Sequence, residues 1–249
     1  MTNQERVTVF IGGVFICGML VAAVITSSNW LGLNLVTAGE DTTEVRQSGY
    51  FNKIEASDSI NVNIKVGDTN EIVVKAPSRV LAKIKTEVSS DTLKISDDGW
   101  YLWQTGGRTM QVDVTVKSLQ EIKVLGSGWV NVAGLVTDNL SVTLSGSGDV
   151  EIQSLKINNR LTINLSGSGD INLQGQANNM EVETSGSGSA YLDKMEVQNA
   201  RLKVTGSGDS QVKVINDLDV TISGSGDVQY AGNPRVNKSV TGSGDLQKL

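Results

Sequence analysis

The chain has 249 residues, of which 39% are hydrophobic and 4% aromatic, and its formal net charge is −6. This composition is sufficient for one aliphatic core plus a membrane segment, and it offers no basic patch for nucleic acid. Because the chain has no histidine and only one cysteine, a Ser-His-Asp catalytic arrangement and an intrachain disulfide are both excluded.

Residues 1–28 are predicted to form a transmembrane anchor or a secretory signal. Residues 7–25 carry no charge, Arg6 precedes them, and the next charged residue is Glu40. A spanning helix needs about twenty apolar residues, whereas the apolar core of a signal peptide is usually shorter. The length of the run therefore favours an uncleaved anchor, through which the protein would contact the membrane.

The flanks of this segment predict the orientation of the protein. Arg6 favours a cytoplasmic amino terminus, and Trp30 suits the membrane interface. A cleaved signal ending near Ser28 or Ala38 is the alternative. Either route places residues 40–249 outside the cytoplasm, in the cell envelope.

Residues 29–49 read as a tether, because their apolar residues follow no regular period. Residues 50–124 are predicted to form irregular opening coils, with some antiparallel pairing. Apolar and polar residues alternate over residues 60–66 before a Gly-Asp turn, and Pro77 opens a short segment that suits one helical turn. A separate small β-domain is the alternative for this part of the chain.

Residues 97–107 interrupt the strand pattern with three large aromatic side chains, Trp100, Tyr101 and Trp103. An aromatic platform beside acidic residues suits a sugar or a protein partner, and it equally suits a cap over an open solenoid end. Trp129, at the first Gly-Ser-Gly corner, is expected to pack near this loop. These four aromatic residues are the candidate ligand-binding residues.

The carboxyl-terminal half, residues 125–249, repeats a Gly-Ser-Gly motif at steps of 18 to 21 residues. The motif begins at Gly126, Gly146, Gly167, Gly186, Gly206, Gly224 and Gly242. A period near twenty residues is the length of one coil of a parallel β-solenoid and is too short for a helical-pair repeat. The period therefore predicts an all-β, single-stranded parallel β-helix with a structural glycine turn in each coil.

Apolar residues between the turns support this fold. Leu140, Val142 and Leu144 alternate with polar residues before a turn, and Val150 and Ile152 resume the alternation after it. This pattern is typical of two half-buried strands that meet at a corner. Stacked coils, about 4.8 Å apart, would place these side chains in ladders and form a rod roughly 30 Å long.

Several motifs in the chain occur in the same order as in a known family. They are Tyr50-Phe51-Asn52-Lys53-Ile54-Glu55, then Leu81 to Glu87 and Leu93-Lys94-Ile95, the Leu-Ser-Gly-Ser-Gly-Asp turns, and Gly232-Asn233-Pro234 before Thr241 to Asp245. Together they resemble the GIN domain, the head domain of an auto-transporter adhesin family, over residues 50–249. This resemblance implies a right-handed parallel β-helix in a bacterial envelope protein. Trp129 and Ser189 depart from it, since the family usually has Asp at these corners.

The corner aspartates are the candidate metal ligands. They are Asp149, Asp170, Asp209, Asp227 and Asp245. Calcium favours several oxygen ligands, but calcium-binding β-rolls repeat every nine residues, whereas this chain has one Asp per coil of about twenty. The preferred interpretation is that each Asp accepts hydrogen bonds from its own turn, so no cofactor is expected.

The sequence thus predicts a non-catalytic, exported cell-envelope protein that acts as an adhesin or ligand-binding module. Glycans and envelope proteins are the expected partners. One alternative is a structural envelope protein that self-associates through the coil end near Leu246 and Leu249. The weakest alternative is a polysaccharide-active enzyme with its site in residues 40–107, because the regular coil length after Gly126 leaves no room for the loops of a cleft.

Overall fold

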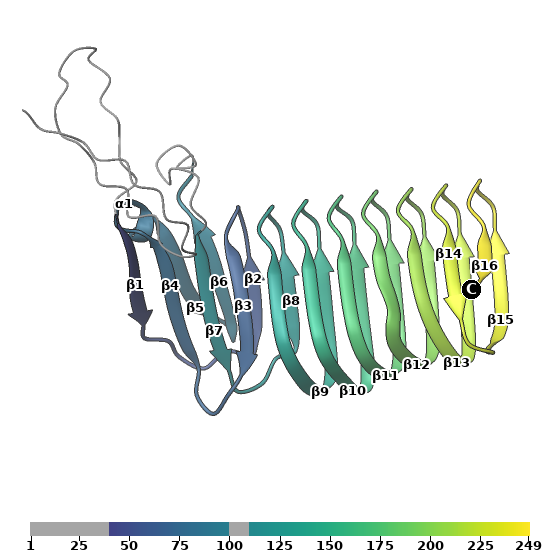
Figure 1. Ribbon diagram of the computed structural model, residues 1–249, viewed down its shortest axis with the longest axis horizontal. Coiled ribbons are helices and arrows are strands. Elements are labelled where there is room, and N and C mark those ends of the chain that lie inside the picture. Colours follow the sequence, from purple (N-terminus) through teal and green to yellow (C-terminus); the bar gives the residue numbers. More distant parts are fainter. Residues whose placement is uncertain (1–39, 100–109) are drawn as a thin grey trace, which may run out of the picture. The chain divides into compact units, whose positions relative to one another are not determined.

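The computed structural model describes residues 40–99 and 110–249, all of which lie in one compact unit, Val36–Leu249. This part of the chain forms a β-solenoid of about six turns with one helical turn (Figure 1). All of its strands belong to one hydrogen-bonded sheet of sixteen strands. The predicted all-β solenoid is therefore confirmed.

Short elements make up the opening coils. They are β1 (Asp41–Arg46), β2 (Lys53–Ala56), β3 (Asn61–Val66), β4 (Glu71–Pro77), α1 (Ser78–Leu81), β5 (Ile84–Ser89), β6 (Thr92–Asp97), β7 (Gln111–Val116) and β8 (Glu121–Val124). Five long strands and three short ones follow. They are β9 (Val130–Leu144), β10 (Val150–Leu165), β11 (Ile171–Thr184), β12 (Ala190–Val204), β13 (Ser210–Ile222), β14 (Val228–Ala231), β15 (Arg235–Val240) and β16 (Leu246–Lys248).

Each long strand leaves a Gly-Ser-Gly turn, bends at its middle and returns to the next turn (Figure 1). We call the residues after a turn the outgoing leg and those before the next turn the returning leg. Strand β10 pairs in parallel with β9 along both legs, from Val150 opposite Val130 to Leu165 opposite Leu144. Successive coils therefore lie in register, and equivalent residues form ladders.

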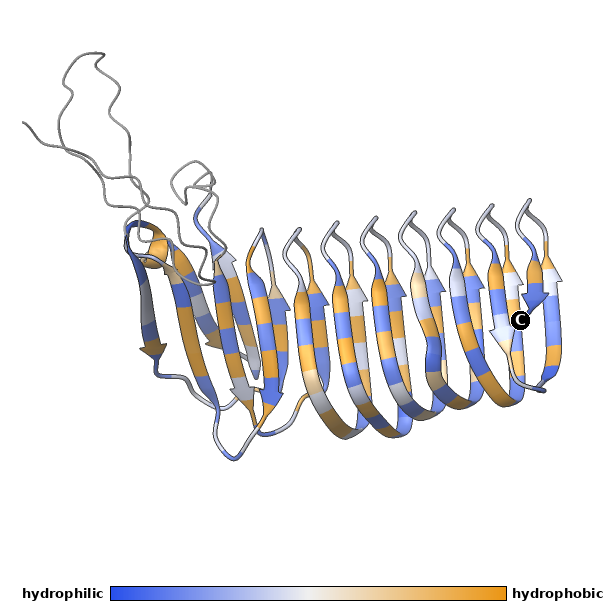
Figure 2. Cartoon of the chain, in the orientation of Figure 1, coloured by the Kyte–Doolittle hydropathy of each residue, from blue (hydrophilic) through white to orange (hydrophobic). Residues whose placement is uncertain are grey.

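The core lies between the two legs and is almost entirely aliphatic. One ladder crosses eight strands, through Leu93, Ile54, Ile122, Val142, Ile163, Val182, Leu202 and Val220. Each of these side chains is at most 1% exposed. Figure 2 shows the corresponding alternation of apolar and polar residues along the strands. Because a single coil cannot bury its own apolar face, the stack supplies the burial that stabilises the fold.

The sheet continues without a break from the opening coils into the repeats. Strand β8 pairs in parallel with the returning leg of β9, and β3 pairs in parallel with its outgoing leg. Antiparallel pairs occur where β4 joins β7, β1 joins β4 and β5 joins β6. The helical turn α1 follows Pro77, as the sequence indicates.

The side chain of Arg46 ties the first strand to the end of α1. Its guanidinium donates hydrogen bonds to the carbonyl oxygen of Leu81 at 3.1 Å and to Oγ1 of Thr86 at 3.2 Å. Within α1, Val80 is fully buried. Arg46 thereby joins β1, the end of α1 and β5.

The interpretation of residues 29–49 as a tether differs from the structure in one part, because Asp41–Arg46 forms β1. Side chains on both faces of β1 are exposed, so the strand has no apolar period for a sequence pattern to detect. No helix within residues 40–99 and 110–249 is long and apolar enough to cross a bilayer. The predicted membrane segment, residues 7–25, lies outside the described residues.

Candidate binding surface at the turn edge

The Gly-Ser-Gly turns form one edge of the solenoid, where backbone lies directly on backbone. The amides of Ser147 and Gly148 both donate to the carbonyl oxygen of Gly126, each at 3.1 Å. A Cβ atom added to Gly146 would lie 1.8 Å from that oxygen. Only glycine fits between stacked turns, so close approach, rather than a left-handed backbone, explains the repeated residue.

The corner aspartates bond between coils. The amide of Asp170 donates to Oδ1 of Asp149 at 2.9 Å, and the amide of Asp245 donates to Oδ1 of Asp227 at 2.7 Å. The expectation that each Asp bonds within its own turn differs from this geometry, because stacking places the next coil's amide beside the carboxylate. At Ser189 the hydroxyl takes the carboxylate's place and accepts from the amide of Asp209 at 3.3 Å.

These contacts indicate that the column of corner aspartates has a structural role. Oδ1 of Asp149, Asp209 and Asp227 each accepts a hydrogen bond from a backbone amide of the next coil, and such a bond compensates part of the repulsion between stacked charges. Within the described residues, no three acidic, cysteine or histidine side chains are grouped so that they could hold a metal ion.

Trp129 occupies the corner position that Asp holds in most later coils. Its amide donates to Oδ1 of Asn61 at 3.2 Å, while the residue is 38% exposed. The indole borders a shallow depression of about 330 Å³, which Asn131, Asp149 and Glu151 also line. This is an exposed aromatic ring surrounded by amide and carboxylate groups.

The strands on either side of the aromatic segment predicted from the sequence end and begin at the same edge. Strand β6 pairs with β2, which pairs with β8, and β7 pairs with β3, which pairs with β9. The connection from Asp97 to Met110 therefore replaces a turn. Trp100, Tyr101 and Trp103 lie within this connection but outside the described residues.

The base of this connection is acidic and well bonded. The amide of Asp97 donates to Oδ2 of Asp58 at 3.0 Å, and Nζ of Lys85 pairs with Oδ1 of Asp98 at 2.6 Å. Burial raises the pKa of Asp97; the Gly99 amide opposes this effect, and the nearby charges of Asp58 and Asp98 add to it. The edge thus carries three neighbouring carboxylates, those of Asp58, Asp97 and Asp98.

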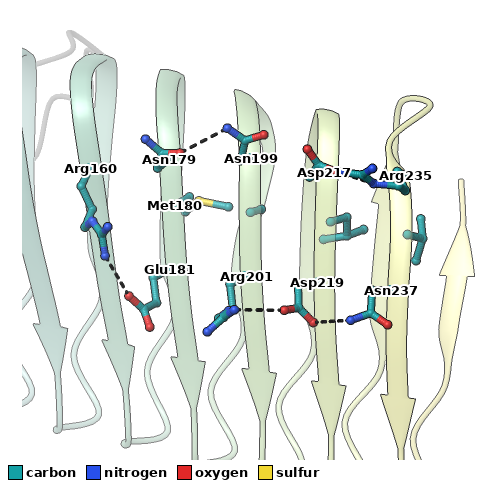
Figure 3. A pocket seen from close by; sticks show the side chains of 13 residues that line it. Arg160, Asn179, Met180, Glu181, Asn199, Arg201, Asp217, Asp219, Arg235 and Asn237 are labelled. Carbon is teal, nitrogen blue, oxygen red and sulfur yellow. Dashed lines mark hydrogen bonds and ion pairs between the residues drawn. The ribbon is translucent and has the colours of Figure 1, made fainter.

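A second depression, of about 700 Å³, lies on the outer surface of the returning legs (Figure 3). Ion pairs between neighbouring coils cross it: Arg160 with Glu181 at 3.5 Å, Arg201 with Asp219 at 3.2 Å, and Arg235 with Asp217 at 2.6 Å. These side chains are largely exposed, so each pair contributes about 0 to 1 kcal/mol. Sequence reasoning missed this surface. Aligning the repeats on their glycines would have placed Arg201 beside Asp219 and Asp217 beside Arg235.

The fold and its edge define a class of protein. It is a parallel β-solenoid with an exposed aromatic residue and carboxylates along the edge formed by its Gly-Ser-Gly turns. The chain belongs to the family described as "Putative auto-transporter adhesin, head GIN domain", whose model matches residues 50–234. The resemblance identified in the sequence is therefore confirmed. A comparison with curated proteins finds no match.

Several solved structures share the fold. A "putative adhesin" from Bacteroides fragilis is 25% identical, has a TM-score of 0.76, and matches over 84% of this chain and 97% of its own. A "putative adhesin" from Parabacteroides merdae is 20% identical, with a TM-score of 0.61 over 86% of this chain and 98% of its own. A "Putative lipid binding protein" from Parabacteroides distasonis is 20% identical, with a TM-score of 0.68 over 85% of this chain and 97% of its own. The last two show the fold alone.

Proposed function

We propose that the protein is a non-catalytic binding module of the cell envelope, an adhesin that holds its ligand at the turn edge around Trp129. The observation that carries this proposal is the exposed indole at a corner, beside Asn131, Asp149 and Glu151. Aromatic rings flanked by hydrogen-bonding groups are common in recognition sites, because the ring supplies contact area and the polar groups supply orientation. The family and the relative from Bacteroides fragilis, both described as adhesins, support this function.

The proposal includes export. Residues 7–25 would anchor the chain in the membrane, with residues 40–249 on the outer side, as the flanking Arg6 and Trp30 favour. The proposal also includes a right-handed winding of the coils, since crossovers between parallel strands are right-handed in almost all proteins.

The test compares two exposed aromatic residues in the full-length protein. Trp129→Ala is expected to weaken binding to a glycan and envelope-polymer array at least tenfold, because a central aromatic contact typically contributes more than about 1.4 kcal/mol. Tyr50→Ala is the control: Tyr50 is 55% exposed and precedes β2, at the end of the coil away from the turns.

The array is read with and without calcium. Circular dichroism checks that the wild type and the Trp129→Ala variant are both folded. If the two then bind equally, the ligand does not bind at the turn edge. A Trp100→Ala, Trp103→Ala variant extends the test to the inserted segment, which the proposal places at the same site.

A further inference from the structure

The outer surfaces of the two legs differ in chemistry. On β9 to β12, the outward side chains at the corners and at the second residue of each strand are Trp129, Asn131, Asp149, Glu151, Asp170, Asn172, Ser189 and Tyr191. We call these eight residues the outgoing face. It combines two aromatic rings with amides, carboxylates and a hydroxyl, and none of the eight is basic. The returning legs instead carry ion pairs that include Arg160, Arg201 and Arg235.

The register arranges the outgoing face as a track along the solenoid axis. Asn131, Glu151, Asn172 and Tyr191 lie opposite one another on successive strands. Trp129 is two residues before Asn131 on the same coil. Trp129 and Tyr191 are therefore three strands apart along the axis, about 14 Å, and two residues apart along the strand direction, about 7 Å. Both aromatic residues are 38% exposed.

The spacing and the chemistry of this track match a linear chain of sugars. One hexopyranose unit is close in length to the separation of neighbouring strands, so an extended glycan along the axis would place about one sugar over each coil. The apolar face of a pyranose ring stacks on an aromatic side chain, and amides and carboxylates hydrogen-bond its hydroxyl groups.

The charge of the track selects among such chains. Asp149, Glu151 and Asp170 contribute three carboxylates with no cation among the eight residues. An anionic polymer laid over them would be repelled, whereas the hydroxyl groups of a neutral sugar donate hydrogen bonds to carboxylates. We propose that the outgoing face binds a linear, uncharged polysaccharide that runs along the solenoid axis from Trp129 to Tyr191.

This inference rests on the proposed function, because Trp129 is the first contact in both. The test measures the binding of neutral β-linked glucose and mannose oligosaccharides of increasing length to the full-length protein by calorimetry. Affinity is expected to rise with length up to about four sugars, which would span the four coils, and then to level off. Binding should change little between low and high salt, since the contacts are not ionic.

Variants separate the inference from the proposed function. Tyr191→Ala should abolish the gain in affinity with length while leaving the binding of a disaccharide unchanged. Trp129→Ala should weaken both at least tenfold, and Tyr50→Ala should change neither. If Trp129→Ala reduces binding while Tyr191→Ala has no effect at any length, the axial track is wrong and the proposed function stands.

Two other results would overturn the inference. If neutral oligosaccharides bind equally to the wild type and to both variants, neither the track nor the turn edge is the binding site. Tighter binding of chitosan, a cationic polysaccharide, with strong loss of affinity in salt would identify a surface for cations rather than for uncharged sugars.

Discussion

At the scale of single residues, Gly167 illustrates how closely the coils stack. A Cβ atom at this position would lie 1.8 Å from the carbonyl oxygen of Gly146, a backbone atom that cannot rotate away. Gly134 differs, because it has a φ of +74° and nothing within 4 Å of an added Cβ. Gly167 is therefore required for steric reasons, whereas Gly134 is required for its backbone conformation.

Gly167→Ala is expected to lower the free energy of unfolding by about 3 kcal/mol or more, since neighbouring coils must separate to admit the methyl group. Gly134→Ala should cost only about 1 to 2 kcal/mol, the penalty for a left-handed backbone at a residue with a side chain. Urea denaturation of both variants measures the difference. Equal losses would show that close stacking at the turn contributes nothing specific.

At the scale of elements, Asp113 links three strands of the opening coils. Its carboxylate accepts a hydrogen bond from Asn63 on β3 at 2.9 Å and one from Gln111 on its own strand at 2.7 Å. Nζ of Lys75 on β4 pairs with the other oxygen at 2.6 Å. This cluster joins the antiparallel strand β4 to the parallel strands of the solenoid.

The pKa of Asp113 predicts how the stability of the opening coils depends on pH. Burial by itself would raise this pKa, but the hydrogen bonds from Lys75, Asn63 and Gln111 outweigh it and lower the pKa below its ordinary value. The stabilising contribution is therefore present above the unfolded pKa, near 4, and is lost as pH falls through the folded pKa.

Asp113→Asn should accordingly reduce stability at pH 7 and show a smaller further loss on acidification than the wild type. Hydrogen exchange of β3, β4 and β7 at pH 7 and about pH 3 measures this effect. Asp138→Asn, which changes an exposed carboxyl in the bend of β9, is the control. Parallel acid dependence of the wild type and Asp113→Asn would contradict the assignment.

The opening coils also show what a sequence pattern can and cannot predict. The alternation of apolar and polar residues predicted the strands around Val62 and Leu93, because one face of each strand is buried and the apolar residues therefore recur at every second position. The pairing of β3 with β9, 64 or more residues away, leaves no such local signal. Trp129 was recognisable in the sequence because it departs from the repeat. Asn131 and Glu151 could be assigned to the same surface only from the strand register, which places them opposite each other.

At the scale of the whole molecule, two apolar ladders end in lysine. Val220 in the returning leg of β13 lies opposite Lys238 on β15, and Tyr230 on β14 lies opposite Lys248 on β16. Both lysines are exposed, although they occupy positions that are apolar in the preceding coils. Lysine at an edge opposes pairing with another strand, since its charge would have to be buried. This feature disfavours self-association through the coil end near Leu249.

The double variant Lys238→Val, Lys248→Leu is therefore expected to associate through its last coil. Its mass in light scattering should rise with concentration, while the wild type stays constant in mass. The control, Lys203→Val with Lys213→Leu, makes the same change in composition at positions that pair with Glu183 and Glu196 on the outer surface. A constant mass for the first variant would show that lysine does not protect this end.

The regularity of the turns has a consequence for how the chain finds its alignment. A turn that stacks on its neighbour mainly through glycine and backbone would stack equally well on the next turn but one, so a folding chain could omit a repeat without losing the pattern. The bends in the middle of the long strands differ from one coil to the next. Gly134, Ser154 and Gly175 have positive φ in the bends of β9, β10 and β11, whereas the fully described bends of β12 and β13 contain no such residue. The irregular bends, rather than the uniform turns, thus distinguish one coil from the next.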